Sequence, residues 1–194
     1  VSGINTDVGY ITQDDNLLPW RTLRGNIEVA LEFRGIPASQ RHEQAAKYIA
    51  KVGLRGFENH YPHELSGGMR KRCALVRTLI YEPDIILMDE PFSALDVQTR
   101  NLMENELLEI WAQERKTVLF ITHDLEEAIA LSDRVIVMTA SPGKVKGTDD
   151  IPLGRPRSVT EVRFHPAFGA LYEAMWKDLK DEVQGRYEKS RRRA

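Results

Sequence analysis

The chain has 194 residues, with 27 basic and 29 acidic side chains and a formal net charge of −2 at pH 7. Its length suits one domain with a buried core. The balanced charge gives no indication of a nucleic-acid partner. A single cysteine, Cys73, excludes an internal disulfide and fits a reducing compartment. No apolar run approaches the roughly 20 residues of a membrane helix, so any role at a membrane would depend on a partner.

The first part of the chain is expected to form a short strand over residues 8–12 that leads to Gln13. Taken alone, Gln13 could be a surface amide at a strand end. A polar turn over 14–16 precedes the apolar segment Leu17-Leu18-Pro19-Trp20. An apolar loop of this kind needs cover, which could come from internal packing or from another protein.

Two helices are expected next, over residues 22–35 and 39–52. The second would have Ala46, Ile49, Ala50 and Gly53 near its end. A loop over 54–64 follows. It contains His60 and His63, which raise the alternative of a metal pair, although no cysteine and only one obvious carboxylate lie nearby.

The segment Leu65–Met69 reads as a loop that opens a helix over 69–81, with Met69, Cys73, Val76 and Ile80 on one face. Ser66 is expected to cap this helix. Gly67 and Gly68 lack a Cβ, so a ligand could approach their backbone closely. A helix N-terminus favours anions, above all phosphate. The alternative is a serine-capped helix with a glycine turn and no ligand.

An apolar strand over 85–88 ends in two adjacent carboxylates, Asp89 and Glu90. Open α/β sheets bind their ligands at the carboxyl ends of strands. Two carboxylates at such an end would repel each other unless a cation or a proton held them. Mg²⁺ binds one or two carboxylates together with phosphate oxygens, and the second acid could polarise an attacking water. The alternative is a solvated acidic turn.

The middle of the chain continues with Asp96 as the expected N-cap of a helix over 97–113. Leu102, Leu107, Ile110 and Trp111 would face the core. An almost wholly apolar strand over 117–122 is typical of a sheet that is buried on both faces. His123 follows this strand, where it could hydrogen-bond a γ-phosphate and orient water, or be a structural histidine.

The last third of the chain is expected to contain a helix over 124–131, a strand over 134–138 and an irregular link over 149–156. A helix over 166–185 would follow, with an apolar stripe at Phe168, Leu171, Met175, Leu179 and Val183. The basic tail over 186–194 is interpreted as a frayed, solvated end. Contact with anionic lipid headgroups is the alternative.

Together these segments resemble the nucleotide-binding subunits of ABC transporters. Five stretches match the motifs of that family in the family's order: Gln13 its Q-loop, Leu65–Met69 its signature loop, Ile85–Glu90 its Walker B strand with the catalytic glutamate, Ser93–Asp96 its D-loop and Thr122–Asp124 its switch histidine. Leu18-Pro19-Trp20 resembles the branch that serves nitrate, sulfonate, taurine and related importers.

The resemblance implies an α/β fold, similar to P-loop NTPases, with a helical subdomain over about 22–80 and a catalytic core over 81–140. It implies ATP and Mg²⁺ as cofactors. Asp89 and Gln13 would serve the Mg²⁺, Glu90 the attacking water and His123 the γ-phosphate, with Gln13 also coupling the site to transport.

The resemblance also implies partners. Ser66, Gly67, Gly68 and Asp96 would contact the nucleotide site of a second subunit in a head-to-tail dimer. The dimer would lie at the cytoplasmic face of the cell membrane against a transmembrane permease subunit, and it would act indirectly with a solute-binding protein. No nucleic-acid partner is implied.

Two departures from the family pattern stand out. The phosphate loop Gly-x-x-x-x-Gly-Lys-Ser/Thr does not occur in the 194 residues. It would lie upstream of Gln13, so we expect the chain to lack the N-terminal part of the protein, with its first strands and its adenine-stacking aromatic. Such a fragment alone would be inactive and of marginal stability. Lys71 stands where the family usually has glutamine.

Two other functions stay open from the sequence. One is a degenerate, non-hydrolytic subunit that lends its signature loop to an active partner. The acids and His123 argue against it. The other is a soluble ABC protein of repair or translation, which the lack of a second cassette and of a heptad run disfavours.

Overall fold

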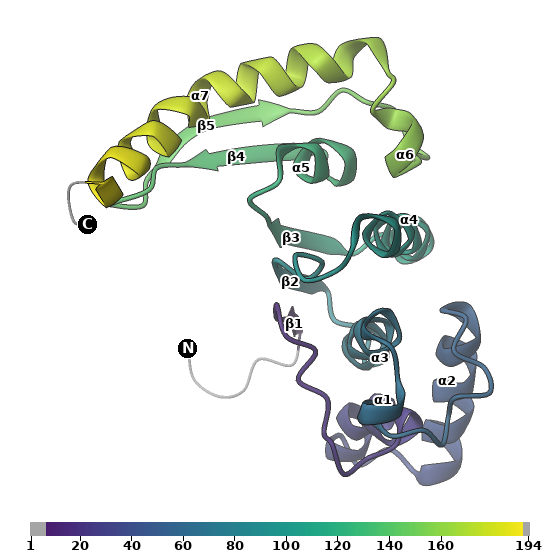
Figure 1. Cartoon of the computed structure of the whole chain (residues 1–194). Coiled ribbons are helices and arrows are strands. Elements are labelled where there is room, and N and C mark those ends of the chain that lie inside the picture. The colour runs from purple at the N-terminus through teal and green to yellow at the C-terminus, as the bar shows by residue number, and fades with distance from the viewer. Residues whose placement is uncertain (1–6, 192–194) are drawn as a thin grey trace. The chain divides into compact units, whose positions relative to one another are not determined.

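The computed structural model describes residues 7–191, without the side chains of residue 114 and residues 181–191. The chain forms two compact units, the first ending at Ile121 and the second beginning at Thr122. Each unit has its own sheet and its own helices (Figure 1).

The first unit is built on a parallel three-stranded sheet of β1 (Val8–Ile11), β2 (Ile85–Asp89) and β3 (Thr117–Ile121) in the order β1-β2-β3. Ile11 lies beside Met88, and Asp89 lies beside Ile121. The carboxyl ends of all three strands therefore lie at one edge of the sheet. This confirms the strands that the apolar runs predicted.

Four α-helices accompany this sheet: α1 (Leu23–Phe33), α2 (Ala38–Lys51), α3 (Gly67–Leu79) and α4 (Val97–Glu114), with a short 3₁₀ turn, η1 (Pro62–Glu64), before α3. The hydroxyl of Thr22 caps α1 by accepting from the backbone N–H of Gly25 at 3.3 Å. In Figure 1, α3 lies next to the sheet, and α1 and α2 lie on the side of α3 that is away from the sheet. The α/β fold with a helical part before β2 agrees with the expectation.

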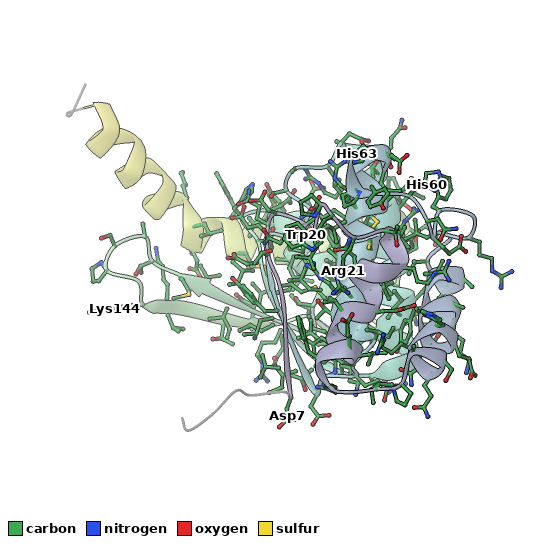
Figure 2. The ribbon with its side chains drawn as sticks, turned by 90° about the horizontal axis from the view of Figure 1, so that it is seen from below. Asp7, Trp20, Arg21, His60, His63 and Lys144 are labelled. Carbon is green, nitrogen blue, oxygen red and sulfur yellow. The ribbon has the colours of Figure 1, made fainter. Side chains whose placement is uncertain are left out.

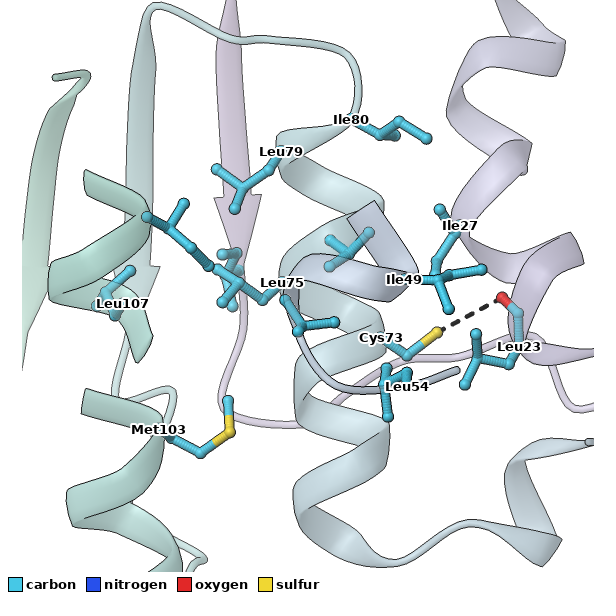
Figure 3. Close-up of a cluster of buried hydrophobic side chains, with 14 of the residues drawn as sticks. Leu23, Ile27, Ile49, Leu54, Cys73, Leu75, Leu79, Ile80, Met103 and Leu107 are labelled. Carbon is cyan, nitrogen blue, oxygen red and sulfur yellow. Dashed lines mark hydrogen bonds between the residues drawn. The ribbon is translucent and has the colours of Figure 1, made fainter. Parts of the chain in front are cut away.

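The core of this unit lies between α3, its neighbouring helices and one face of the sheet (Figure 3). Leu23, Ile27 and Leu54 are fully buried there. Cys73 is also fully buried, and its thiol donates to the carbonyl oxygen of Leu23 at 3.7 Å. Burial raises the pKa of this thiol to about 12. The prediction that Cys73 fills the core is confirmed.

The other face of the sheet carries exposed apolar side chains, and here the expectation of a sheet buried on both faces is wrong for the described residues. Tyr10, Ile85, Leu119 and Ile121 are each at least 41% exposed. Alternate residues of a strand point to opposite faces. Ile11, Ile86 and Met88 on the other face are buried. The helices of the first unit thus cover one face of the sheet.

One expected core position on the helices is also wrong. Leu102 of α4 is 59% exposed, whereas Met103 is fully buried, because the buried stripe of α4 runs through Met103, Leu107 and Ile110. On α2, Ala45 and Ile49 are buried one turn apart, and Ala46 is exposed. On α4 the prediction included Leu102, which lies beside the buried stripe and does not belong to it.

The second unit contains α5 (Leu125–Leu131), β4 (Arg134–Met138), β5 (Val145–Asp150), α6 (Val159–Val162) and α7 (Pro166–Arg191). β4 and β5 pair antiparallel, and α7 lies along this hairpin in Figure 1. Phe168 and Met175 of α7 are buried, as the apolar stripe predicts. The part of the stripe at Val183 lies outside the described side chains.

Two boundaries of the second unit differ from the expectation. Residues 149 and 150, expected in an irregular link, belong to β5, whose polar sequence Val-Lys-Gly-Thr-Asp-Asp gives no apolar alternation. Pairing with β4 through the turn at residues 141–143 forms this strand. Helix α7 continues through residues 186–191, which we expected to fray. None of the helices within residues 7–191 has a stretch long and apolar enough to cross a bilayer.

Candidate functional site

The carboxyl ends of β1 and β2 bring three of the expected site residues together. Gln13 follows β1, and its amide Nε2 donates to the hydroxyl of Ser93 at 3.2 Å. That hydroxyl donates to the carbonyl oxygen of Glu90 at 3.0 Å. Glu90 follows Asp89, the last residue of β2. A short hydrogen-bonded chain therefore links the loop after β1 to the turn after β2.

The turn at Glu90 has a special backbone geometry. Its φ is +43°, in the left-handed region that non-glycine residues seldom adopt. The Glu90 N–H donates to the carbonyl oxygen of Ile121 at 2.9 Å, which holds the turn against the end of β3. Such strain persists only where the surrounding structure imposes it, and it clusters at functional sites.

Asp89 is half-buried and lies next to a phenol. The hydroxyl of Tyr10, on β1, donates to Asp89 Oδ2 at 3.3 Å. Removal from water, followed by the neighbouring Asp89 carboxylate, raises the pKa of Tyr10. Tyr10 therefore remains a neutral donor to Asp89 at neutral pH, and Asp89 keeps acceptor capacity on Oδ1.

The donor set at this edge fits Mg²⁺. Asp89 supplies a carboxylate, and Gln13 supplies an amide oxygen while its nitrogen is held by Ser93. Hard oxygen ligands of this kind suit Mg²⁺, which commonly completes its shell with phosphate and water. No group of three or more His, Cys, Asp or Glu side chains within the described part of the chain could hold a metal by itself. A metal at Asp89 and Gln13 would therefore need oxygens from a ligand such as a phosphate.

A second group of expected residues lies where α3 and α4 begin. The Ser66 hydroxyl caps α3 by accepting from the N–H of Met69 at 3.3 Å. The Asp96 carboxylate caps α4 by accepting from the N–H groups of Gln98 and Thr99 at 3.1 and 3.0 Å. Hydrogen bonds from Thr99 hold the pKa of Asp96 below its ordinary value. Both capping predictions are confirmed.

The two glycines of the signature loop have different surroundings. A Cβ at Gly68 would lie 3.0 Å from Thr99 Cγ2, so the first turns of α3 and α4 approach closely there. A Cβ at Gly67 would meet nothing nearer than Arg70 Nη2 at 4.0 Å. Gly68 therefore has a packing reason inside the chain. At Gly67 the approach of a ligand remains the prediction.

His123 belongs to the second unit. It lies between Thr122 and Asp124, and Asp124 caps α5 by accepting from the N–H groups of Glu126 and Glu127 at 2.9 and 3.3 Å. The chain reaches His123 two residues after Ile121, the register partner of Asp89. That His123 joins the site at Asp89 and Glu90 stays a prediction.

Part of the apolar segment before α1 packs inside the chain, and part of it is exposed. Leu17 packs on the core, and the N–H of Leu18 donates to Asn26 Oδ1 at 2.7 Å. Trp20, labelled in Figure 2, is 71% exposed. In the same view, His60 and His63 come from the segment before α3, where His63 stacks on Tyr61 and His60 packs against Phe57.

The sequence reasoning missed the residues that support this site. It gave no separate role to Tyr10 or to the Ser93 hydroxyl, whose contacts depend on strand register. It also missed that Arg70, Lys71 and Arg77 of α3 all bind the loop after β1. The two arginines lie seven residues apart on one helix face, a spacing that could have indicated a common partner.

Comparison with known proteins shows the family of the chain. Residues 2–93 match the family model described as ABC transporter. An uncharacterised ABC transporter ATP-binding protein of Methanocaldococcus jannaschii is 53% identical over 164 residues, which are 84% of this chain and 61% of that protein.

Two relatives have more specific names. The nitrate import ATP-binding protein of Synechocystis sp. is 43% identical over 75% of this chain and 55% of that protein. The taurine import ATP-binding protein of Yersinia pestis is 43% identical over 75% of this chain and 57% of that protein. The chain thus spans little more than half the length of these relatives.

A solved structure shares the fold. It is the dimeric post-hydrolysis state of an ATP-binding cassette bound to ADP and Pi, with a TM-score of 0.64 and 31% identity over 76% of this chain and 64% of that one. The fold is that of ABC ATPase cassettes. The chain belongs to the ATP-binding proteins of ABC transporters.

Proposed function

We propose that the protein containing this chain is the ATP-hydrolysing subunit of an ABC importer. The observation that carries the proposal is that Gln13, Asp89 and Glu90 lie at the carboxyl ends of β1 and β2, where Ser93 joins the Gln13 amide to the backbone of Glu90. Two carboxylates and an amide at that edge suit the metal-assisted attack of water on a phosphate.

Each residue of this edge has a role in the proposed reaction. Mg²⁺, when bound, would neutralise charge on the phosphate oxygens of ATP. Asp89, with Tyr10 donating to one of its oxygens, and the amide oxygen of Gln13 would hold it. Glu90, on its strained turn, would accept the proton of the attacking water. His123 would hydrogen-bond the γ-phosphate.

The residues at the start of α3 and α4 are proposed to serve a second subunit. Ser66, Gly67 and Gly68 would present helix N–H groups to the phosphates of ATP held by the partner in a head-to-tail dimer. Asp96 would reach the same interface. The close approach of Gly68 to Thr99 supports this arrangement, because it sets the two helix starts side by side within one subunit.

The relatives support the proposed importer role and the proposed class of solute. Those for nitrate and taurine import suggest a small anion or small organic solute. The subunit would then lie peripherally at the cytoplasmic face of the membrane, bound to a permease and served indirectly by a solute-binding protein. The exposed indole of Trp20 supports a protein partner at the loop before α1.

The test of hydrolysis is Glu90→Gln in the native protein, because the amide keeps the size of the side chain and cannot accept the proton. We expect ATP affinity within about threefold of the wild type and kcat lower by a factor on the order of 100 to 1,000. Glu43→Gln is the matched control, since Glu43 is an exposed residue whose carboxylate pairs with Lys47 on α2. It should leave both constants unchanged.

Undiminished turnover in Glu90→Gln would remove Glu90 from this role. A wild-type protein that binds ATP without hydrolysing it would instead favour the non-hydrolytic subunit. For the solute, the subunit and its permease would be reconstituted in vesicles, and ATP-dependent uptake of nitrate and taurine would be measured. Uptake of neither would overturn the proposed solute class while leaving the ATPase proposal intact.

A further inference from the structure

Three basic side chains of α3 hold the loop that follows β1. Arg70 Nε donates to Asp15 Oδ2 at 2.9 Å. Arg77 donates to the carbonyl oxygens of Asp15 and Asn16 at 2.9 and 2.7 Å. Lys71 Nζ donates to the carbonyl oxygen of Gln13 and lies 3.5 Å from that of Thr12. The loop is thus fixed to one helix at several successive residues.

Lys71 differs from the two arginines in its burial and its target. Its residue is 7% exposed, and burial lowers the pKa of its ammonium, with Asp15 and Asp14 opposing that shift. A buried cation is costly unless acceptors surround it. Lys71 alone binds the backbone of Gln13, whereas Arg70 and Arg77 bind the residues that follow.

The residue whose backbone Lys71 binds, Gln13, is also one of the proposed site residues. The Gln13 carbonyl oxygen accepts from Lys71, while the Gln13 side chain donates to Ser93 beside Glu90. Lys71 also lies just over one turn from the start of α3, which Ser66 caps. One helix therefore links the cap of the signature loop to the residue that completes the strand-end group.

We propose that Lys71 is a positioning residue that fixes Gln13 for the reaction and couples its placement to α3. This inference rests on the proposed ATPase function for its kinetic consequence. Lys71 acts through the carbonyl oxygen of Gln13 and touches no reacting atom. Displacement of a positioned group by about 1 Å can cost a factor on the order of 100 in rate.

The variants are Lys71→Met, which removes every donor at similar length, and Lys71→Gln, which keeps a neutral amide donor. Arg72→Met is the matched control. Arg72 is the next residue of α3, and it pairs with Glu106 of α4 at 2.8 Å rather than with the loop. All three changes remove a partly or wholly buried cation from the same helix, so a merely structural effect would be shared.

The first readout is hydrogen exchange of residues 12–18 in the native protein. We expect Lys71→Met to speed exchange of this segment by a factor on the order of ten, and Arg72→Met to leave it unchanged. Equal exchange in Lys71→Met and the wild type would overturn the proposal, and so would an equal increase in both Met variants.

The second readout is steady-state ATP hydrolysis. We expect Lys71→Met to lower kcat by a factor on the order of 10 to 100 with the KM for ATP within about twofold, because Gln13 would hold the metal in the proposed reaction. Lys71→Gln should recover a large part of kcat. A change in KM alone, or an equal loss in Arg72→Met, would contradict the positioning role.

The two proposals fail in different ways. A wild-type protein without ATPase activity would overturn the proposed function, while the exchange experiment would still decide whether Lys71 holds Gln13. Normal hydrolysis by the wild type and by Lys71→Met would overturn the positioning role and leave the proposed function standing.

Discussion

Lys71 of the first unit and Arg157 of the second are buried cations that hold backbone carbonyl oxygens in different ways. Lys71 of the first unit acts together with Arg70 and Arg77 on one loop. Arg157 of the second unit has a side chain that is 2% exposed, and the neighbouring Arg155 donates to one carbonyl oxygen there, that of Leu131. Arg157 donates to the carbonyl oxygens of Ile129, Ala130, Ser132, Ile151, Leu153 and Gly154.

The difference lies in how the hydrogen bonds are distributed. Around residues 13–16, each of three side chains binds acceptors of its own, so the loss of one loosens the part of the loop that it holds. Around Arg157, one guanidinium with a planar fork joins the end of α5 to the segment after β5, and Arg155 adds bonds to Leu131 and Asp133. Loss of one support of the loop therefore has a local effect, whereas the loss of Arg157 removes most of the bonds at its junction.

The largest expected effect is that of Arg157→Met. Its loss leaves several buried carbonyl oxygens without donors, so we expect the free energy of unfolding of the second unit to fall by about 3 kcal/mol. Hydrogen exchange of residues 145–157, followed as a function of denaturant concentration, measures this free energy. Arg134→Met is the control, because Arg134 forms an exposed pair with Asp150 and should change stability by less than about 0.5 kcal/mol. A similar small change for Arg157→Met would remove the contrast between the two cations.

A smaller effect is expected for Arg77→Met in the first unit. It removes the donors to Asp15 and Asn16 while Arg70 and Lys71 still hold the loop, so the cost should be about 1.5 kcal/mol. Denaturant unfolding followed by the exchange of residues 12–18 measures it. A loss as large as that of Arg157→Met would show that Arg77 is not one of several supports of the loop.

The smallest effect concerns a buried neutral donor on the same helix, Cys73. Its thiol pKa is raised from 9.0 to about 12 by burial, with Arg77 opposing and Asp15 adding to the shift. Between pH 9 and about pH 12, the Cys73 thiol is ionised in the unfolded chain but protonated in the folded protein. The contribution of this thiol to the free energy of unfolding is therefore complete below pH 9 and falls as the pH rises. The free energy of unfolding should be about 1 kcal/mol lower at pH 10 than at pH 8.5 through this group.

The check is the same pH series for Cys73→Ala. That variant is less stable throughout because it leaves a cavity, but its stability should lack the decline that the thiol contributes. Parallel pH curves for the two proteins would show that the Cys73 thiol ionises in the folded protein as readily as in the unfolded one.

The sequence predicted much of the fold because the first unit follows simple local rules. Apolar runs predicted β1, β2, β3 and β4, and side-chain caps at Ser66 and Asp96 marked helix starts. Strand β5 was not predicted, because its polar residues form a strand only by pairing with β4. The exposure of the sheet face that carries Leu119 and Ile121 was not predicted either, because the apolar residues of a strand do not show which of its faces is covered.

The candidate site was predicted as a set of residues rather than as a set of contacts. Asp89, Glu90 and Gln13 follow from their places at strand ends, where parallel sheets bring side chains to one edge. The Gln13–Ser93 contact and the Tyr10–Asp89 contact depend on how strands and turns lie side by side. No local pattern around Lys71 indicated that its target is the backbone of Gln13.

The sequence by itself determined the order of elements, the helix caps, the acids that end β2 and the family, because these depend on residue type and on spacing along the chain. Tertiary structure alone decided the register that sets Ile11 beside Met88, the left-handed turn at Glu90 and the burial of Lys71 against the loop. Those features join residues far apart in the chain. Their energies come from burial and from hydrogen-bond partners that exist only once the chain has folded.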